Sequence, residues 1–337
     1  MVADAGPTCP ADDALSNAAA TLLLAGNAPD SNTLVAAVRE AGSDAVLVHA
    51  LFQPHDDAAA TQKWLAELRA VSDADLVCGE ASGSAGRLLI ASARAGSLLP
   101  LTAASSVVRG TLAPGFDHPE LVISAADGTL TRLGLEPSML HDGIPLQEDL
   151  ARPAKIQLLA RGHAGPRPIA ERELPATRSR AHAIAALPPT AAGSSASTTA
   201  KDATANDLAA LLVIRLNSLR AERERLAVRD NRLLATLATA HARAVCQAGK
   251  LAHELSPGQD PEARVEQAGI RARLVGETIA RAGDAGSAFA ELGESPSHLL
   301  TLLEPRFTDV GVGVAHDSES RSCVVVLLAA WPRYVGR

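Results

Sequence analysis

The sequence predicts an α+β protein of two or three domains, and three observations support this prediction. The chain has 337 residues, while one domain usually takes about 100 to 200. Short extended runs fill residues 101–177, and apolar residues recur at helical spacing after residue 206. A stretch of small polar residues without periodicity separates these two regions. Together they indicate a chain in which a strand-rich part is followed in sequence by a separately folded, helix-containing part.

The N-terminal part, residues 9–98, is expected to be an α/β unit because it repeats a pattern found near the C-terminus. Residues 37–68 match residues 264–292, and residues 73–96 match residues 307–331. The two copies differ at polar positions: Ala50, with His49 beside it, stands where the second copy has Glu277. The first copy is therefore interpreted as degenerate. Chance similarity between two alanine-rich segments is the alternative.

The middle part, residues 101–177, is expected to be a small antiparallel β-sandwich. Turn signals such as Ala-Pro-Gly and Ala-Asp-Gly separate its extended runs, and most runs alternate apolar and polar residues. The runs are SSVVRGTL, ELVISAAD, LTRLGLE, KIQLLARG and RPIAEREL.

Residues 178–205 are expected to form a flexible linker, because small polar residues dominate the stretch 186–207. Two helices should follow within residues 206–337. The first carries Leu208, Leu212, Leu216 and Leu219 at helical spacing. The second is expected to be capped by Asp230 and to end at Gly249, with His241 in its core-facing stripe.

Composition argues against nucleic acid as a partner. Aromatic residues make up 2% of the chain, which leaves little surface on which bases could stack. The formal net charge is -7, and the basic residues are not gathered into a face that would bind phosphates. No run approaches the ~18 to 20 apolar residues of a membrane-spanning helix, so no transmembrane segment is predicted.

Four cysteines, two in each half of the chain, bear on the compartment. They form no Cys-x-x-Cys pair, which argues against a zinc ribbon. One disulfide in each half would fit an oxidising compartment, and four isolated buried thiols in a cytosolic protein are the alternative. The first residues lack the basic and apolar segments of a signal peptide. We expect a secreted or periplasmic protein whose signal peptide is absent from this chain.

The C-terminal part contains four ordered motifs: KLAHELSPGQDPEARVEQAGI, LVGETIA, ELGESPSHLLTLLEPRFTDVGVGV and SCVVVLLA. Together they resemble the CAP superfamily, named for cysteine-rich secretory proteins, antigen 5 and pathogenesis-related proteins, and especially its bacterial SCP-like members. The resemblance covers residues 206–337. It implies an α-β-α sandwich for this part, and a degenerate CAP-like unit for residues 9–98.

The resemblance also implies a groove that gathers polar side chains from separate segments. The matching positions are His253, Glu277, Ser295 and His298, with Glu294 as a possible second carboxylate. The Ser295 hydroxyl is expected to cap the helical turn that carries His298. The side chains of His253, Glu277 and His298 should lie within about 4 to 8 Å of one another, a range that a metal ion or a water could bridge. Three positions depart from the family pattern, namely Thr278, Leu292 and Leu299.

Three uses of this groove remain open at this point. The first is binding of a small ligand, a lipid or an envelope partner without catalysis. The second is a metal-assisted hydrolase acting on peptide or cell-wall substrates, in which His253 and His298 would hold a divalent cation such as Zn²⁺. The third is a hydrogen-bonded groove without a ligand. The groups lack a complete catalytic signature, so the non-enzymatic hypothesis is preferred.

The implied sandwich also suggests how the cysteines pair. Cys246 lies late in the second helix and Cys323 at the start of the last strand, two elements that pack together in such a sandwich. Cys9 precedes the first helix, and Cys78 starts the matching strand of the first copy. The expected disulfides are Cys9–Cys78 and Cys246–Cys323.

Overall fold

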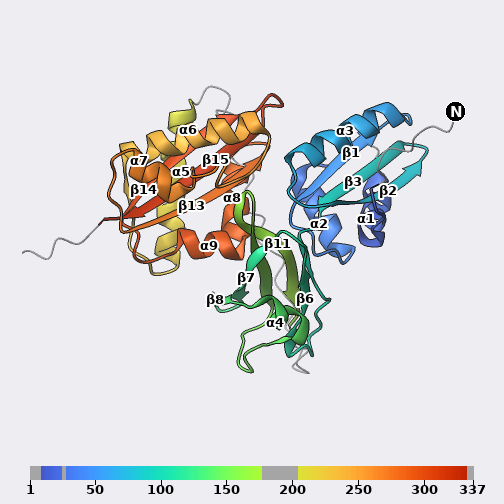
Figure 1. Cartoon of the computed structure of the whole chain (residues 1–337), viewed down its shortest axis with the longest axis horizontal. Coiled ribbons are helices and arrows are strands. Elements are labelled where there is room, and N and C mark those ends of the chain that lie inside the picture. The colour runs from blue at the N-terminus through green and yellow to red at the C-terminus, as the bar shows by residue number, and fades with distance from the viewer. Residues whose placement is uncertain (1–8, 25–27, 177–203, 332–337) are drawn as a thin grey trace, which may run out of the picture. The chain divides into compact units, whose positions relative to one another are not determined.

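The computed structural model describes residues 9–24, 28–176 and 204–331. Both helices and strands occur along these residues, partly in separate runs, which confirms the predicted α+β class (Figure 1). They form two compact units: one comprises residues 1–175, 248–260 and 295–300, and the other residues 176–247, 261–294 and 301–337. The domain boundaries predicted from the sequence stay predictions. Most of the predicted linker 178–205 lies outside the described residues.

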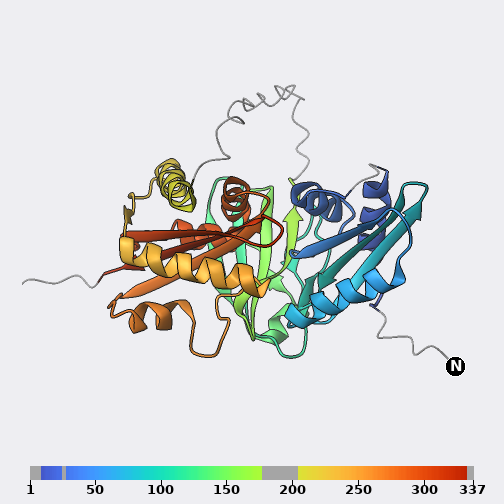
Figure 2. The ribbon, with the colours of Figure 1, turned by 90° about the horizontal axis from the view of Figure 1, so that it is seen from above.

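The N-terminal part of the first unit is a three-stranded antiparallel sheet with helices on both faces (Figure 2). Asp12 and Asp57 cap the first and third helices by accepting hydrogen bonds from backbone amides of the first turn. The strands lie in the order β1-β3-β2. The elements are α1 (Asp13–Leu23), α2 (Ser31–Glu40), β1 (Val48–Gln53), α3 (Ala58–Val71), β2 (Leu76–Gly83) and β3 (Gly86–Ala93).

Alternation along β3 divides the core of this part into two layers. Leu88 and Ile90 pack against the apolar residues of α1 and α2. Ala91 points to the other face and packs with Leu65 of α3. A sheet covered on both faces in this way needs apolar residues at successive positions of its central strand, which explains the run Leu-Leu-Ile-Ala at 88–91.

The middle part of the first unit is built on a four-stranded antiparallel sheet in the order β11-β10-β7-β8. Each of the five extended runs predicted from the sequence contains a strand, and a short helix that was not predicted follows β8. Ile156 and Leu158 of β10 lie in the apolar core on one face of this sheet. The elements are β4 (Gly96–Leu98), β5 (Val107–Val108), β6 (Gly110–Leu112), β7 (Asp117–Ala125), β8 (Leu130–Gly134), α4 (Pro137–Asp142), β9 (Ile144–Pro145), β10 (Ala154–Gly162) and β11 (Gly165–Leu174).

The second unit is a sheet in the order β12-β14-β15-β13 between helices, the predicted α-β-α sandwich (Figure 2). Val310, Val312 and Val314 of β14 face a core shared with α5 and α8. Within the described residues, no helix combines the length and apolar character needed to span a bilayer. The elements are α5 (Ala205–Glu222), β12 (Arg229–Asp230), α6 (Arg232–Ala248), α7 (Pro261–Gln267), β13 (Leu274–Ala282), α8 (Ala285–Glu294), β14 (Asp309–His316) and β15 (Ser322–Ala330).

The start of α6 differs from the prediction by one residue. Asp230 belongs to β12, which pairs in parallel with β14. The side-chain oxygen of Asn231 accepts hydrogen bonds from the amides of Leu233 and Leu234 instead, at 3.1 and 3.4 Å. Asn231 therefore caps the helix, because the preceding residue is already used in the sheet.

The N-terminal sheet β1-β3-β2 and the sheet of the second unit share an arrangement in which a glycine lets a helix approach a strand closely. A Cβ added to Gly79 in β2 would lie 2.1 Å from the backbone nitrogen of Ser16 in α1. A Cβ added to Gly311 in β14 would lie 2.0 Å from the backbone nitrogen of Ala235 in α6. In both sheets the last strand in sequence also lies between the other two of its set, as β1-β3-β2 and β13-β15-β14. Descent of the N-terminal part from a second CAP-like copy stays a prediction.

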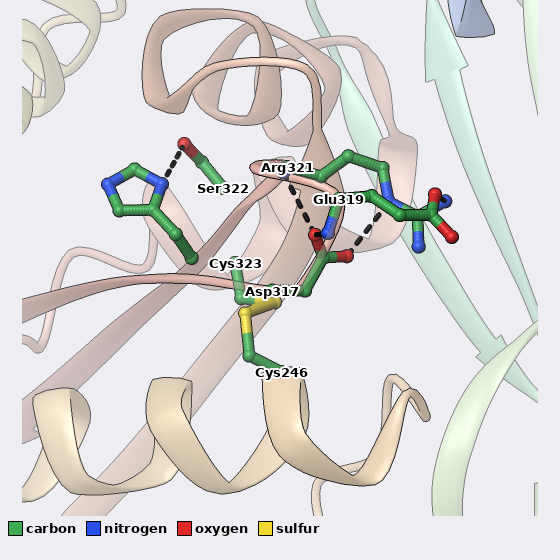
Figure 3. Close-up of a disulfide and its surroundings, with 7 residues drawn as sticks. Cys246, Asp317, Glu319, Arg321, Ser322 and Cys323 are labelled. Atoms are coloured by element: carbon green, nitrogen blue, oxygen red, sulfur yellow. Dashed lines mark hydrogen bonds and ion pairs between the residues drawn. A yellow bond between two sulfur atoms is a disulfide. The ribbon is translucent and has the colours of Figure 1, made fainter.

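Both predicted disulfides are present, one in each unit. Cys9 pairs with Cys78 of β2, and Cys246 near the end of α6 pairs with Cys323 of β15 (Figure 3). Cys246 and Cys323 are both buried, whereas Cys9 and Cys78 are half-buried. The second disulfide fastens α6 to the central strand of its sheet next to the turn that Asp317 and Arg321 close by an ion pair of 2.8 Å.

Candidate functional site

Two of the predicted site residues lie on short segments of the first unit. His253 is in the loop that follows α6, and His298 is in α9 (Pro296–Leu302). The loop is closed on itself, because the Glu254 carboxylate accepts a hydrogen bond of 2.6 Å from the backbone N–H of Gly258. Each histidine is half-buried. Both are thus held on segments with fixed local geometry.

His298 is a neutral imidazole at physiological pH. Burial, and secondarily the nearby His253, lowers its pKa to about 3. The Nδ1 atom of His298 is enclosed and has no hydrogen-bond partner among the described residues. A buried ring nitrogen without a partner is uncommon and costs free energy.

The turn before His298 is held by a residue that the sequence did not indicate. The side-chain carbonyl oxygen of Gln157, on β10, accepts hydrogen bonds from the backbone N–H of Ser297 at 3.1 Å and from the Ser295 hydroxyl at 3.3 Å. The prediction that the Ser295 hydroxyl caps this turn is therefore wrong for the Ser297 amide, which Gln157 caps. Ser295 contacts Gln157 and the Ser297 hydroxyl instead.

Glu277, on β13 of the second unit, is engaged by two side chains. Its side chain is fully buried, and Oε2 lies 2.7 Å from Nη2 of Arg264 on α7. Its Oε1 lies 3.7 Å from Nε2 of His241 on α6. His241 is buried, as expected for a core histidine, and it also lies beside this carboxylate. The Glu277 charge is thus compensated within its own unit, which a buried carboxylate requires.

The structure brings His253, Ser295 and His298 into the first unit and places Glu277 in the second. Convergence of His253, Glu277 and His298 in one groove stays a prediction. Among the described residues, no group of three or more histidine, cysteine, aspartate or glutamate side chains is placed to hold a metal ion. The departures from the family pattern lie inside the protein: Leu292 and Leu299 are buried apolar residues, and Thr278 is fully buried.

Glu291, on α8, is a second perturbed carboxyl group. Burial, and secondarily the charge of Glu294, raises its pKa to about 7. Glu294, considered from the sequence as a substitute carboxylate, thus lies close enough to Glu291 to repel its charge. The Glu294 charge therefore disfavours ionisation of Glu291.

We therefore expect the stability of the second unit to fall as pH rises between about 4.5 and 7, because the folded state retains a proton on Glu291 that the unfolded chain has lost. Glu291→Gln removes this dependence. The variant should therefore be more stable than wild type by about 2 to 3 kcal/mol at pH 8, and about as stable as wild type at pH 4. Denaturant unfolding monitored by Trp331 fluorescence in a Trp64→Phe background measures this, since the chain has two tryptophans. Glu262→Gln, at an exposed position of α7, is the control. Parallel pH profiles for wild type and Glu291→Gln would contradict the expectation.

Comparison with known proteins agrees with the motifs. Residues 213–328 match the model of the CAP, or cysteine-rich secretory protein, family. The second unit, which contains most of this segment, is an α-β-α sandwich with a buried disulfide. Residues 213–328 form a CAP domain, as the ordered motifs predicted.

Several solved structures are similar to this chain at low identity. One is an outer surface protein from Borrelia burgdorferi, with 18% identity over 39% of this chain and 97% of that chain, and a TM-score of 0.36. Another is an extracellular protein containing an SCP domain from Bacillus anthracis, with 16% identity over 60% of this chain and 64% of that chain, and a TM-score of 0.35. A third is a cysteine-rich secretory protein from Staphylococcus aureus, with 10% identity over 65% of this chain and 66% of that chain, and a TM-score of 0.32. The comparison with curated proteins found no match.

Proposed function

We propose that this protein is exported and uses its CAP domain to bind a small ligand, a lipid or an envelope partner without catalysing a reaction. Two disulfides support export, because disulfides persist in oxidising compartments. The binding groups would be His253, Ser295, His298 and Glu277. Their mutual arrangement is part of the proposal.

The observation that carries the proposal is the state of His298. Its pKa of about 3 lies far from neutral pH, whereas an efficient general acid or base has a pKa near the operating pH. Its unpartnered Nδ1 suits a hydrogen bond with a ligand. The contacts of Glu277 also argue against a role in proton transfer, because Arg264 and His241 already engage its two oxygens. These groups are better suited to recognition than to proton transfer.

The metal-assisted hydrolase is the second candidate, favoured by one observation. A neutral imidazole is the form in which histidine binds Zn²⁺, and His298 is held in that form. Catalytic zinc sites usually have three protein ligands and one open position. The described residues provide no such group of three. The donor set of two histidines therefore fits zinc poorly.

Binding measurements on the purified, oxidised full chain test the proposal. The probes are phosphatidylcholine vesicles with and without cholesterol, and soluble peptidoglycan fragments. At least one probe is expected to bind, and His298→Ala should weaken that binding about tenfold, as loss of one hydrogen bond of about 1 to 1.5 kcal/mol does. His55→Ala, at an exposed position, is the matched control.

Two results would contradict the proposal. One is the absence of binding to every probe. The other is one zinc ion per chain by elemental analysis, together with peptide or peptidoglycan cleavage that is lost in His298→Ala. The second result would establish the hydrolase in its place.

A further inference from the structure

Gln157 occupies an unusual position for a glutamine. It lies in β10, an inner strand of the middle sheet, where it is paired with Glu171 of β11 and Val122 of β7. Its neighbours Ile156 and Leu158 belong to the apolar core, so Gln157 points to the opposite face of the sheet. It is nonetheless only 2% exposed. A buried amide on the face away from the core requires polar partners above it.

The turn that carries His298 supplies these partners. The Nε2 amide of Gln157 donates to Oγ of Ser295 at 3.2 Å and to a carboxylate oxygen of Glu171 at 2.9 Å. Its Oε1 accepts from the Ser297 backbone N–H at 3.1 Å. Both ends of the amide are thus used, and the donor and acceptor groups of the Ser295–Ser297 turn are used with them.

The same hairpin also reaches the loop of the other histidine. The backbone N–H of Glu254 donates to the carbonyl oxygen of Ala164, in the turn between β10 and β11, at 3.4 Å. A Cβ placed on Gly165, the first residue of β11, would lie 3.6 Å from Cβ of His253, which is van der Waals contact. The β10–β11 hairpin therefore contacts both histidine-bearing segments, at its tip and along its length.

Glu171 anchors the hairpin side of this contact. Its carboxylate lies 2.8 Å from Arg39 of α2 and 3.8 Å from Lys155 of β10, and 10% of its side chain is exposed. A polar chain therefore runs from α2 through Glu171 and Gln157 to the Ser295 turn. Because the contact consists of hydrogen bonds between uncharged groups at its outer end, water or a ligand can replace each of them.

We propose that the β10–β11 hairpin is a built-in cover of the His298 turn, with Gln157 as its latch. In the closed state, the Gln157 amide occupies the Ser295 hydroxyl and the Ser297 amide, two groups beside His298 that an external ligand would use. Ligand binding to this turn then requires release of Gln157. This part of the inference rests on the proposed binding function, whereas the cover itself does not.

Accessibility of His298 in the full, oxidised chain tests the cover directly. Gln157→Ala should increase the rate of His298 modification by diethyl pyrocarbonate, mapped by mass spectrometry, by at least about fivefold, because local opening governs access. The reaction is run at pH 8, where both the buried His298 and an exposed imidazole with the ordinary pKa of about 6.5 are neutral, so the rate reports access and not protonation. Amide hydrogen exchange in residues 295–300 should accelerate in parallel. Gln147→Ala, at an exposed glutamine of the same part, is the control and should change neither rate.

Ser295→Ala provides the second variant, since it weakens the latch from the other side and leaves β10 intact. Far-UV circular dichroism checks that each variant is folded. Unchanged modification and exchange in the folded variants would overturn the cover. Binding of the vesicles and peptidoglycan fragments is measured alongside and should be tighter in Gln157→Ala. Increased access without binding to any of these probes would contradict the proposed function while supporting the cover.

Discussion

Replacing Gly311 by alanine is expected to destabilise the second unit by about 3 kcal/mol or more. The added Cβ would lie 2.0 Å from the backbone nitrogen of Ala235 and 2.1 Å from the carbonyl carbon of Leu234. Backbone atoms of a helix cannot rotate out of the way as the end of a side chain can. The helix α6 would have to move away from β14, although a disulfide fastens it to β15.

Denaturant unfolding followed by Trp331 fluorescence, in the Trp64→Phe background, measures this loss. Gly293→Ala is the matched control, because Gly293 lies in α8 with no atom within 4 Å of the added Cβ. That substitution should stabilise the unit by about 0.5 to 1 kcal/mol, since alanine favours helices over glycine. Equal effects of the two substitutions would show that the close approach of α6 does not constrain the sheet.

Replacing Arg220 by methionine should destabilise the same unit by about 3 to 5 kcal/mol. Arg220, on α5, is fully buried and donates hydrogen bonds to three backbone carbonyls. These belong to Leu226, Leu302 and Glu304, at 2.8, 2.6 and 3.2 Å. Methionine fills similar space without a donor, so the three carbonyls lose their partner in a buried setting.

The lysine variant separates hydrogen bonding from volume. Arg220→Lys keeps the charge and part of the donor set, so its loss should be smaller than that of Arg220→Met. Arg223→Met, at the exposed end of the same helix, should change stability by less than about 0.5 kcal/mol. A full-length chain in which all three substitutions have equal effects would contradict a bridging role for Arg220.

The fold was predictable where sequence patterns are local. The helical spacing of Leu208, Leu212 and Leu216 predicted α5, and the extended runs of residues 101–177 predicted strands in the middle sheet. The same spacing gave no sign of Arg220. Two of its partners, the carbonyls of Leu302 and Glu304, are more than 80 residues away in sequence. No local pattern therefore marks Arg220 as buried.

The residues of the candidate site were proposed from the sequence only where they lie inside recognisable motifs. His253, Glu277, Ser295 and His298 match motif positions that the family resemblance marks as functional. Arg264 lies in one of the same segments without such a role, and Gln157 lies outside them. Gln157 lies in an ordinary alternating strand and meets Ser295 across 138 residues. Arg264 on α7 reaches Glu277 across the start of β13, and its neighbours Glu262 and Glu266 give its surroundings the charge pattern of a solvated helix. Partners of this kind become visible only when the chain is folded.

The composition of the first unit sets an order for its assembly. Residues 1–175 need two further pieces of chain, 248–260 and 295–300, to complete it. During synthesis the middle sheet emerges before these two pieces, and its Gln157 face stays open until Ser295 has left the ribosome. A nascent chain interrupted before residue 295 therefore presents a bare polar strand surface, and the last step in building the N-terminal unit awaits the nearly complete polypeptide.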